Sequence, residues 1–492
     1  MKFKISKSYI ILISVLTAIA MIISVSGCNK QESSADSSSA TVSEASPDEA
    51  TGAAASAASK TRISESDITV NETKNNSSNG EHAITADGET AKYSNVLVTK
   101  TGDSDGDEAD FYGENSAVFA TNKATLDLNN IVVKSNGAHA NAVFSYGEGT
   151  TVNISDSYIN TTGNCSGGLM TTGGGTMNAE NLTIETSGNS SAAIRSDRGG
   201  GTVNVTGGYY STSGKGSPVI YSTADITVND AELVSTTSEG VVVEGKNSVT
   251  LNNVNLTADN NAHNSDKSDH FNAVMIYQSM SGDAAQGTSS YTMNGGSLVN
   301  KNGDIFFVNN TATQISLNNV NFTNEGDGVF LRAAAAGWGK EGSNGGKVNL
   351  NAENQTINGD MVVDSVSALN LYLKSNSAFT GAINSGGAQG DVYVEIEKGS
   401  KWTLTADSYV SSLTCEADSI NLNGHKLYVN GKEYKEGSAS KGSSIEIKLS
   451  SDGGGNEAPP DGQAPADGQT PPEKPDGQAP QNGQAPPDKP NQ

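Results

Sequence analysis

A repeat of about two dozen residues governs what this chain can fold into, because self-similarity at such a period is typical of solenoid proteins. The repeat runs over residues 124–389, and each copy opens with an apolar–polar–apolar triplet. The triplets are Leu126-Asp127-Leu128, Val152-Asn153-Ile154, Met177-Asn178-Ala179, Val203-Asn204-Val205, Ile226-Thr227-Val228, Val249-Thr250-Leu251, Tyr291-Thr292-Met293, Ile315-Ser316-Leu317, Val348-Asn349-Leu350 and Leu369-Asn370-Leu371.

Two further positions recur in each copy. A turn-forming residue stands two positions after most triplets, and these residue types tolerate a left-handed backbone at little cost. They are Asn130, Asp156, Asn181, Gly207, Asp230, Asn253, Gly295 and Asn319. A second apolar patch follows later in the copy, as at Val143-Phe144, Leu169-Met170, Val219-Ile220, Val241-Val242-Val243, Val274-Met275-Ile276 and Ile305-Phe306-Phe307. Each copy therefore holds short strands separated by turns.

Alternation with a period of two residues predicts strands that have one face in and one face out. One copy cannot bury its apolar face alone, whereas stacked copies share a continuous core and pair equivalent strands. We therefore predict an all-β fold, a parallel β-helix of roughly a dozen coils. A helical solenoid is excluded, because the alanine-rich stretches at residues 53–58 and 333–336 are too short to form stable helices.

The N-terminus carries the features of an export signal. Basic residues at Lys2, Lys4 and Lys7 precede an apolar run, and small residues follow it. The tetrapeptide ending at Cys28 resembles the bacterial lipobox, in which the cysteine is lipidated and becomes the first residue. This resemblance implies a lipoprotein held by Cys28 on the outer face of the bacterial cytoplasmic membrane. An ordinary signal peptide with a chance cysteine is the alternative.

Composition divides the chain into four parts. Residues 1–27 form the signal peptide, and residues 28–60 form a Ser/Ala-rich linker. Residues 61–450 form the β-helix with a C-terminal cap. Residues 451–492 hold ten of the 12 prolines and repeat Asp-Gly-Gln, which predicts a disordered or partly polyproline II tail.

Charge excludes one class of partner. The formal net charge of −25 argues against nucleic acid, because phosphate contact needs basic stripes. It leaves neutral polysaccharides and cell-surface glycans as partners, together with the membrane that a lipid on the N-terminus would enter.

An acidic segment at residues 102–110 is a candidate metal site. It holds Asp103, Asp105, Asp107 and Asp110, and alternating carboxylates in a glycine-bearing loop can supply oxygen ligands to Ca²⁺. Glu108 stands where an EF-hand loop needs its glycine, and no flanking helices are expected. A solvated acidic loop is the alternative to a Ca²⁺ site.

Two insertions after the second apolar patch, at residues 278–289 and 332–345, mark a candidate ligand-binding site, because insertions in a regular repeat often carry function. They lie two coils apart, so we predict a shelf formed by Tyr277, Arg332, Trp338 and Lys340. An exposed Trp ring suits stacking on a sugar. The alternative is that Trp338 only packs its own loop over the core.

Signals for catalysis are weaker. Glycosidases need two carboxylates that face each other across the scissile bond, and no acidic pair stands in a distinctive motif. A lyase would want a basic residue beside a Ca²⁺ site, and Arg195, Asp197 and Arg198 are the best candidates. The alternative for these three is a surface ion pair beside a glycine turn.

Several short motifs resemble those of a known family, the pectate-lyase-like right-handed parallel β-helix surface lipoproteins of Gram-positive bacteria. The motifs are Leu-Asn-Asn at Leu128, Leu251 and Leu317, Phe111-Tyr112-Gly113, Asp197-Arg198-Gly199-Gly200-Gly201, Val243-Glu244-Gly245-Lys246-Asn247, and the segment from Trp402 to Tyr409. The resemblance implies a right-handed β-helix at the cell surface with an adhesin-like or carbohydrate-binding role. We therefore expect a non-catalytic, polysaccharide-binding protein, and the alternative is a Ca²⁺-dependent polysaccharide lyase or glycoside hydrolase.

Overall fold

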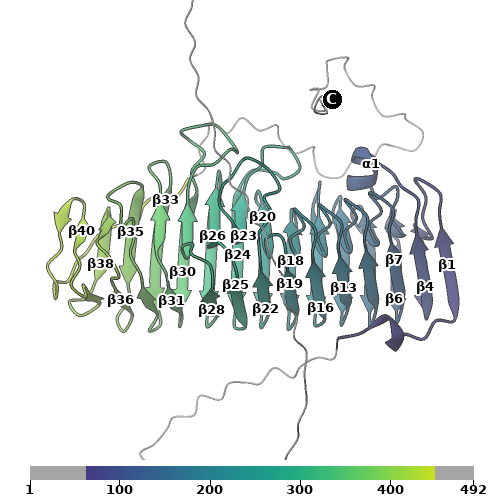
Figure 1. The fold of residues 1–492 in the computed structure, drawn as a ribbon, viewed down its shortest axis with the longest axis horizontal. Helices are drawn as coiled ribbons and strands as arrows, with labels where there is room; N and C mark the ends of the chain where they lie inside the picture. Colours follow the sequence, from purple (N-terminus) through teal and green to yellow (C-terminus); the bar gives the residue numbers. More distant parts are fainter. Residues whose placement is uncertain (1–61, 449–492) are drawn as a thin grey trace, which may run out of the picture. The chain divides into compact units, whose positions relative to one another are not determined.

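The computed structural model describes residues 62–448, which form one compact unit. The unit is a parallel β-helix: its long sheets are built from equivalent strands of successive coils (Figure 1). The longest sheet has 13 strands, so the predicted fold and its dozen or so coils are confirmed. Cys28, the linker at residues 28–60 and the tail at residues 451–492 lie outside the described residues.

Sheet C is built from the apolar–polar–apolar triplets. Val152 and Ile154 point into the coil and are buried, whereas Asn153 between them points outward. The Asn153 amide donates a hydrogen bond of 2.8 Å to Asp127 of the preceding coil, so polar ladders follow the outer face. The strands of sheet C are β3 (Thr90–Ser94), β6 (Thr125–Asn129), β9 (Thr151–Ser155), β12 (Gly175–Glu180), β15 (Gly201–Thr206), β18 (Asp225–Asn229), β21 (Ser248–Asn252), β24 (Thr288–Asn294), β27 (Ala312–Asn318), β30 (Lys347–Glu353), β33 (Ala368–Lys374), β35 (Asp391–Ile396) and β38 (Ser412–Cys415).

Sheet B is built from the second apolar patches. Several of its strands are buried on both faces, as in β26, where all six residues are buried. The strands of sheet B are β2 (Ile84–Asp87), β5 (Val118–Thr121), β8 (Val143–Tyr146), β11 (Leu169–Thr172), β14 (Ile194–Ser196), β17 (Ile220–Ser222), β20 (Val241–Glu244), β23 (Asn272–Tyr277), β26 (Asp304–Asn309), β29 (Leu331–Ala333) and β32 (Met361–Val363).

Sheet A completes each coil, and the chain runs from C to A to B before it enters the next coil. The strands of sheet A are β1 (Glu72–Asn76), β4 (Val96–Lys100), β7 (Val132–Ser135), β10 (Tyr158–Thr161), β13 (Thr183–Thr186), β16 (Tyr209–Thr212), β19 (Glu232–Ser235), β22 (Asn255–Ala258), β25 (Ser297–Asn300) and β28 (Asn321–Asn324). Two shorter sheets form the last coils. They contain β31 (Thr356–Asn358), β34 (Ala378–Thr380), β36 (Lys401–Thr403) and β39 (Ile420–Asn421), and β37 (Ser408–Val410), β40 (Leu427–Val429) and β41 (Lys432–Glu433).

Helices are short in the described part of the chain. A 3₁₀ turn, η1, covers Glu65–Asp67, and α1 covers Gly106–Phe111. Among the described residues, no helix is long and apolar enough to cross a membrane. The helix α1 falls inside the acidic segment that the sequence predicts as an open loop, so that expectation is wrong for residues 106–111.

The turn between sheets C and A is left-handed, as predicted. Asn130, Asn181 and Asn253 each have φ of 53°, and Asp230 has φ of 52°. Asn and Asp enter this conformation more readily than most residues, because their short polar side chains form local hydrogen bonds. One left-handed residue bends the chain sharply from sheet C into sheet A at the same place in each of these coils.

Glycines stack in the connection between sheets A and B, where successive backbones touch. A Cβ atom on Gly188 would lie 1.8 Å from the carbonyl oxygen of Gly163, and one on Gly214 would lie 1.8 Å from that of Gly188. We expect Gly188→Ala to lower the free energy of unfolding by about 1–3 kcal/mol, because rigid backbone must move aside. Chemical denaturation measures this change.

A matched control for Gly188 lies at Gly386, where an added Cβ atom meets nothing within 4 Å. We expect Gly386→Ala to change the free energy of unfolding by no more than about 0.5 kcal/mol. Equal effects of the two substitutions would show that the glycine stack does not limit how closely the coils pack.

Candidate functional site

The outer face of sheet B carries a second hydrophobic cluster, separate from the core inside the coils. Val242, Met275 and Phe307 occupy neighbouring register positions on β20, β23 and β26, and all three are buried. Alternate residues of a strand face opposite sides, so these three would face solvent if nothing covered them. Ala334 and Trp338 of the 332–345 insertion pack against this cluster and help to bury it.

A pocket of about 100 Å³ lies between the strands, the 258–270 segment and Trp338 of the 332–345 insertion. Its aromatic lining is Tyr221, Tyr277 and Trp338, and the ring centroids of Tyr277 and Trp338 lie 5.2 Å apart in an edge-to-face arrangement. Asn272 also lines the pocket; it is 2 % exposed, and its Oδ1 atom has no hydrogen-bond partner. The pocket therefore combines aromatic rings with polar side chains in its lining, such as Asn260, Asn264 and Ser268.

The structure brings together two of the four residues predicted for the ligand shelf. Tyr277 and Trp338 meet at the pocket. Arg332 instead donates two hydrogen bonds to buried Asp304, from Nε to Oδ2 at 2.6 Å and from Nη2 to Oδ1 at 3.2 Å. Lys340 is exposed on the insertion. Trp338 packs against the outer cluster and also lines the pocket, so its role in ligand binding stays a prediction.

The 258–270 segment forms another wall of the pocket and is joined to the Trp338 loop. The Gly337 amide donates a hydrogen bond of 2.7 Å to the carbonyl oxygen of Lys267, whose Nζ atom lies 5.9 Å from the Trp338 ring centroid. His263 stacks on Phe271 with 3.9 Å between ring centroids. The 258–270 segment and the 332–345 insertion, which are far apart in sequence, thus shape one pocket.

Beside the pocket, two buried carboxylates stand on the same outer face. Asp197 follows β14 and Glu244 ends β20, and they are 3 % and 1 % exposed. Arg195 donates to Asp197 Oδ2 from Nη2 at 2.8 Å and from Nε at 3.1 Å. Burial raises the pKa of Asp197 to about 6; the Arg195 guanidinium opposes this rise, and Asp283 and Glu244 add to it. The ion pair of the alternative is present, but between Arg195 and Asp197 it is buried instead of lying at the surface.

Glu244 is held by side chains of its neighbours. Its carboxylate accepts hydrogen bonds from the Tyr221 hydroxyl and from the Ser279 hydroxyl. Burial, together with nearby Glu244, raises the pKa of Tyr221 and of Tyr277 well above the usual value, so both phenols stay protonated near neutral pH. The carboxylate therefore orients the tyrosines of the pocket wall.

Arg198 ties three segments together over the same face. Its Nε donates to Asp283 at 2.7 Å, its Nη1 donates to Asp107 at 3.0 Å, and its guanidinium carbon lies 3.8 Å from the Phe111 ring centroid. The 278–289 insertion and α1 are both fastened in this way to the turn that follows β14. Arg198 therefore stabilises the positions of the 278–289 insertion and of α1.

The four carboxylates predicted to bind Ca²⁺ are not gathered around one point. Asp103 accepts a hydrogen bond of 2.8 Å from the Ala138 amide, and Asp107 pairs with Arg198. Asp105 precedes α1 as its N-cap residue, and Asp110 lies inside the helix. Helix formation turns the side chains in different directions, so the geometry gives the Ca²⁺ prediction no support.

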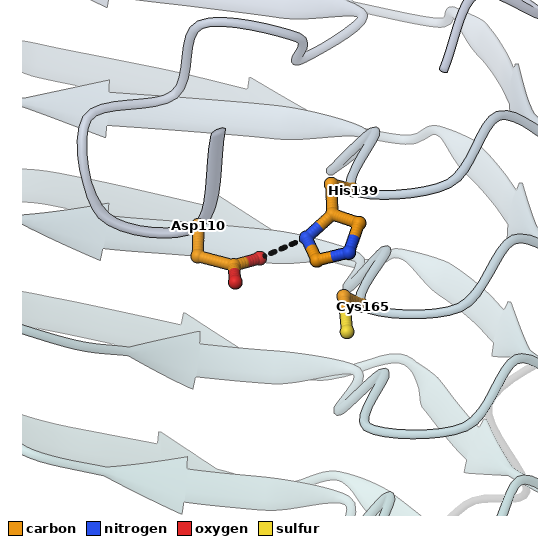
Figure 2. Close-up of side chains that lie close together, drawn as sticks. All are labelled: Asp110, His139 and Cys165. Atoms are coloured by element: carbon orange, nitrogen blue, oxygen red, sulfur yellow. Dashed lines mark hydrogen bonds and ion pairs between the residues drawn. The ribbon is translucent and has the colours of Figure 1, made fainter. Parts of the chain in front are cut away.

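Asp110 belongs instead to a different cluster, with His139 and Cys165 (Figure 2). Asp110 Oδ1 lies 2.7 Å from His139 Nδ1, and one ligand atom of each residue lies within 4.8 Å of the others. Burial, with a smaller contribution from Asp110, raises the pKa of the Cys165 thiol. Sequence reasoning missed this cluster, although His139 and Cys165 stand one repeat apart, which is a usable signal.

A second concavity lies on the outer face of sheet C. It is an open groove of about 660 Å³, and its walls include Asp127, Asn153, Asn178 and Asn204 in register. Its lining has no aromatic residue. The groove therefore offers hydrogen bonds along successive coils but no ring for stacking.

Comparisons with protein family models, with curated proteins and with solved structures give no match for this chain.

Proposed function

We propose that this chain is a non-catalytic, surface-anchored β-helix lipoprotein that binds a polysaccharide or a cell-surface glycan through the pocket on sheet B. The observation that carries the proposal is the edge-to-face pairing of Tyr277 with Trp338 at a pocket on the outer face of the sheet. The anchoring part of the proposal rests on the lipobox-like segment that ends at Cys28.

The chemistry of the pocket suits a sugar. Aromatic rings offer a rigid apolar surface to the C–H face of a sugar ring, and Tyr and Trp also carry polar ends. Hydroxyl groups of a sugar can exchange hydrogen bonds with the polar side chains in the lining, such as Asn264, Ser265 and Ser268. A volume of about 100 Å³ is below the usual range for a whole small-molecule ligand, so the pocket fits an edge or substituent of one residue in a longer chain.

The pocket is also rigid. Glu244 holds Tyr221, and the hydrogen bond from Gly337 to Lys267 ties the Trp338 loop to the neighbouring insertion. A preorganised site loses less side-chain entropy on binding than a flexible one. Such a wall favours reversible recognition, because its aromatic side chains are already in place before the ligand arrives.

The test is binding of Ser59–Gln492 to a panel of bacterial and host polysaccharides, measured on an array and then by calorimetry. We expect Trp338→Ala and Tyr277→Ala each to weaken binding by about tenfold or more, since aromatic anchors in pockets dominate recognition. The matched control is Tyr409→Ala, because Tyr409 stacks on Tyr428 in the last coils, away from the insertions.

Another variant distinguishes the two concavities. Asn204 is an exposed residue of the sheet C groove. If Asn204→Ala weakens binding while Trp338→Ala leaves it unchanged, the ligand site is the groove and our assignment of the site is overturned. Equal binding by all variants would also reject the pocket.

Acid–base chemistry on a polysaccharide is the second candidate function, and the raised pKa of Asp197 beside Glu244 favours it. Against it, both carboxylates are buried and already bonded to Arg195, Tyr221 and Ser279. The same incubations with polysaccharide decide between the two functions. Release of reducing or unsaturated sugar ends by the unmodified protein would assign an enzyme, whereas binding without release is the result we expect.

A further inference from the structure

We propose that Asp110, His139 and Cys165 form a binding site for a divalent transition metal ion of the Zn²⁺ type. Figure 2 shows the three side chains grouped together, with Asp110 on α1 and the other two on turns of neighbouring coils. The site is separate from the sugar pocket, and the proposal does not depend on the proposed function.

The donor set selects the class of metal. A thiolate, an imidazole and a carboxylate are all ligands of Zn²⁺, whereas Ca²⁺ takes oxygen ligands only. A soft sulfur donor and a nitrogen donor favour a borderline-soft ion over Mg²⁺ or Ca²⁺. The fourth position of a tetrahedral ion would be left for water, which is the pattern of a site with three protein ligands.

The distances allow one ion to reach all three residues. Bonds of about 2.0–2.3 Å place the ligand atoms of a tetrahedral Zn²⁺ roughly 3.3–3.6 Å apart. The three donor atoms lie within 4.8 Å of one another. Side-chain rotations that move these atoms by about 1 Å bring them to the separations that a tetrahedral ion requires. His139 and Asp110 have side chains 21 % and 20 % exposed, and Cys165 is half-buried, so the ion can enter from solvent.

The topology brings these ligands together at one place. Asp110 lies between β4 and β5, His139 between β7 and β8, and Cys165 between β10 and β11, so all three occupy the same connection of three successive coils. His139 and Cys165 hold equivalent positions in successive coils, because their backbone amides make equivalent hydrogen bonds to the coil that follows. The His139 amide donates to the carbonyl oxygen of Asn164, the residue before Cys165, and the Cys165 amide donates to that of Asn189, the residue before Ser190. Strand pairing fixes this register, so the ligands are preorganised.

The turn position itself is costly for these residue types. His139 and Cys165 have φ of 51° and 53°, in the left-handed region that side chains other than Asn and Asp enter at a cost. The equivalent residues of the following coils are Ser190 and Gly216, with φ of 54° and 62°. The two coils that follow Asp110 thus carry a metal-binding type of side chain at this turn, whereas the next two coils carry Ser190 and Gly216.

Binding has a defined chemical and structural result. The thiol proton of Cys165 leaves to solvent as the metal–sulfur bond forms, and neutral His139 supplies a ring nitrogen. The ion links α1 to the two coils beneath it. Since Asp107 and Phe111 of α1 contact Arg198, the metal also stabilises the segment that covers this end of sheet B.

The test is titration of metal-free Ser59–Gln492 with Co²⁺, followed by competition with Zn²⁺. We expect one Co²⁺ per chain and a thiolate-to-cobalt charge-transfer absorption in the near ultraviolet. Cys165→Ser should abolish that absorption and weaken Zn²⁺ binding by at least about tenfold. Ser190 shows that serine is accommodated at this turn, so Cys165→Ser is expected to fold, and circular dichroism checks it.

Further variants make the result specific. Asp110→Asn and His139→Gln should each weaken metal binding. Because both variants keep the Cys165 thiol, the charge-transfer absorption should still appear, at a higher concentration of Co²⁺. The matched control is Cys415→Ser, because Cys415 is the other cysteine of this unit and lies in β38. Absence of the absorption in the unmodified protein, its survival in Cys165→Ser, or its loss in Cys415→Ser would each overturn the proposal.

Discussion

Replacing Arg195 with Met is expected to lower the free energy of unfolding by about 3–5 kcal/mol at pH 8, because it leaves a buried carboxylate without its charge partner. The side chains of Arg195 and Asp197 are 15 % and 4 % exposed, and two guanidinium nitrogens donate to one oxygen of Asp197. Met keeps most of the side-chain volume, so the change removes charge more than packing. Chemical denaturation measures the loss.

The pH dependence of that loss has a definite sign. The folded pKa of Asp197, about 6, exceeds its ordinary value of 3.8, so the folded state binds the proton more tightly than the unfolded state. The contribution of Asp197 to stability therefore falls as pH rises from about 4 to 6. Below pH 6 the carboxyl is mostly protonated and needs Arg195 less. The cost of Arg195→Met should thus shrink towards pH 5 and grow above pH 6.

The double variant Arg195→Met/Asp197→Leu is the control for this prediction. Replacing both members of a buried pair with apolar residues avoids an unpaired charge and is often close to neutral. We therefore expect the double variant to be more stable than Arg195→Met alone at pH 8. A loss in Arg195→Met that is the same at pH 5 and pH 8 would show that Asp197 does not titrate between them.

Most of the fold is predictable from sequence because its determinants are local. The triplet Val152-Asn153-Ile154 shows which side chains enter the core, and Asn130 or Asn181 marks the left-handed turn that follows. The recurrence of these signals in each copy implies stacked coils, and equivalent strands of stacked coils pair with one another. Nothing beyond the neighbouring residues is needed for that inference.

The outer face of sheet B is harder to predict. In Val241-Val242-Val243 every residue is apolar, so the sequence does not distinguish the inward residues from outward Val242. The insertions identify Trp338 because loop length is visible in the repeat, but the partners of Glu244 and Arg198 come from segments that only the folded structure brings together. Contacts between distant segments have no local signal.

The Asp110 cluster lies between these two cases. His139 and Cys165 are aligned by the repeat, so their proximity follows from the register alone. The position of Asp110 depends on α1, whose acidic sequence is equally compatible with an open loop. A helix of six residues is too short to be stable by itself, and contacts such as the cation–π pair between Arg198 and Phe111 hold it in place.

The two tryptophans of the chain lead to opposite expectations. Trp402, in β36, is fully buried, its Nε1 donates a hydrogen bond of 2.9 Å to the carbonyl oxygen of Gly381, and its ring stacks on Phe379 with 5.6 Å between centroids. We expect Trp402→Ala to lower the free energy of unfolding by about 3–5 kcal/mol, through lost burial and the cavity that remains. Denaturation followed by far-ultraviolet circular dichroism measures the effect.

Trp338→Ala is the matched control, because Trp338 is partly exposed and lines the pocket on the outer face instead of the core. We expect it to cost about 1 kcal/mol or less in stability while weakening glycan binding. In a solenoid each coil is stabilised by its neighbours, so damage at Trp402 should first loosen the last coils, seen as faster amide exchange in β34, β36 and β39. Equal stability losses for the two variants would mean that Trp338 serves the fold as much as Trp402 does, and the argument for a ligand-binding ring would lose its basis.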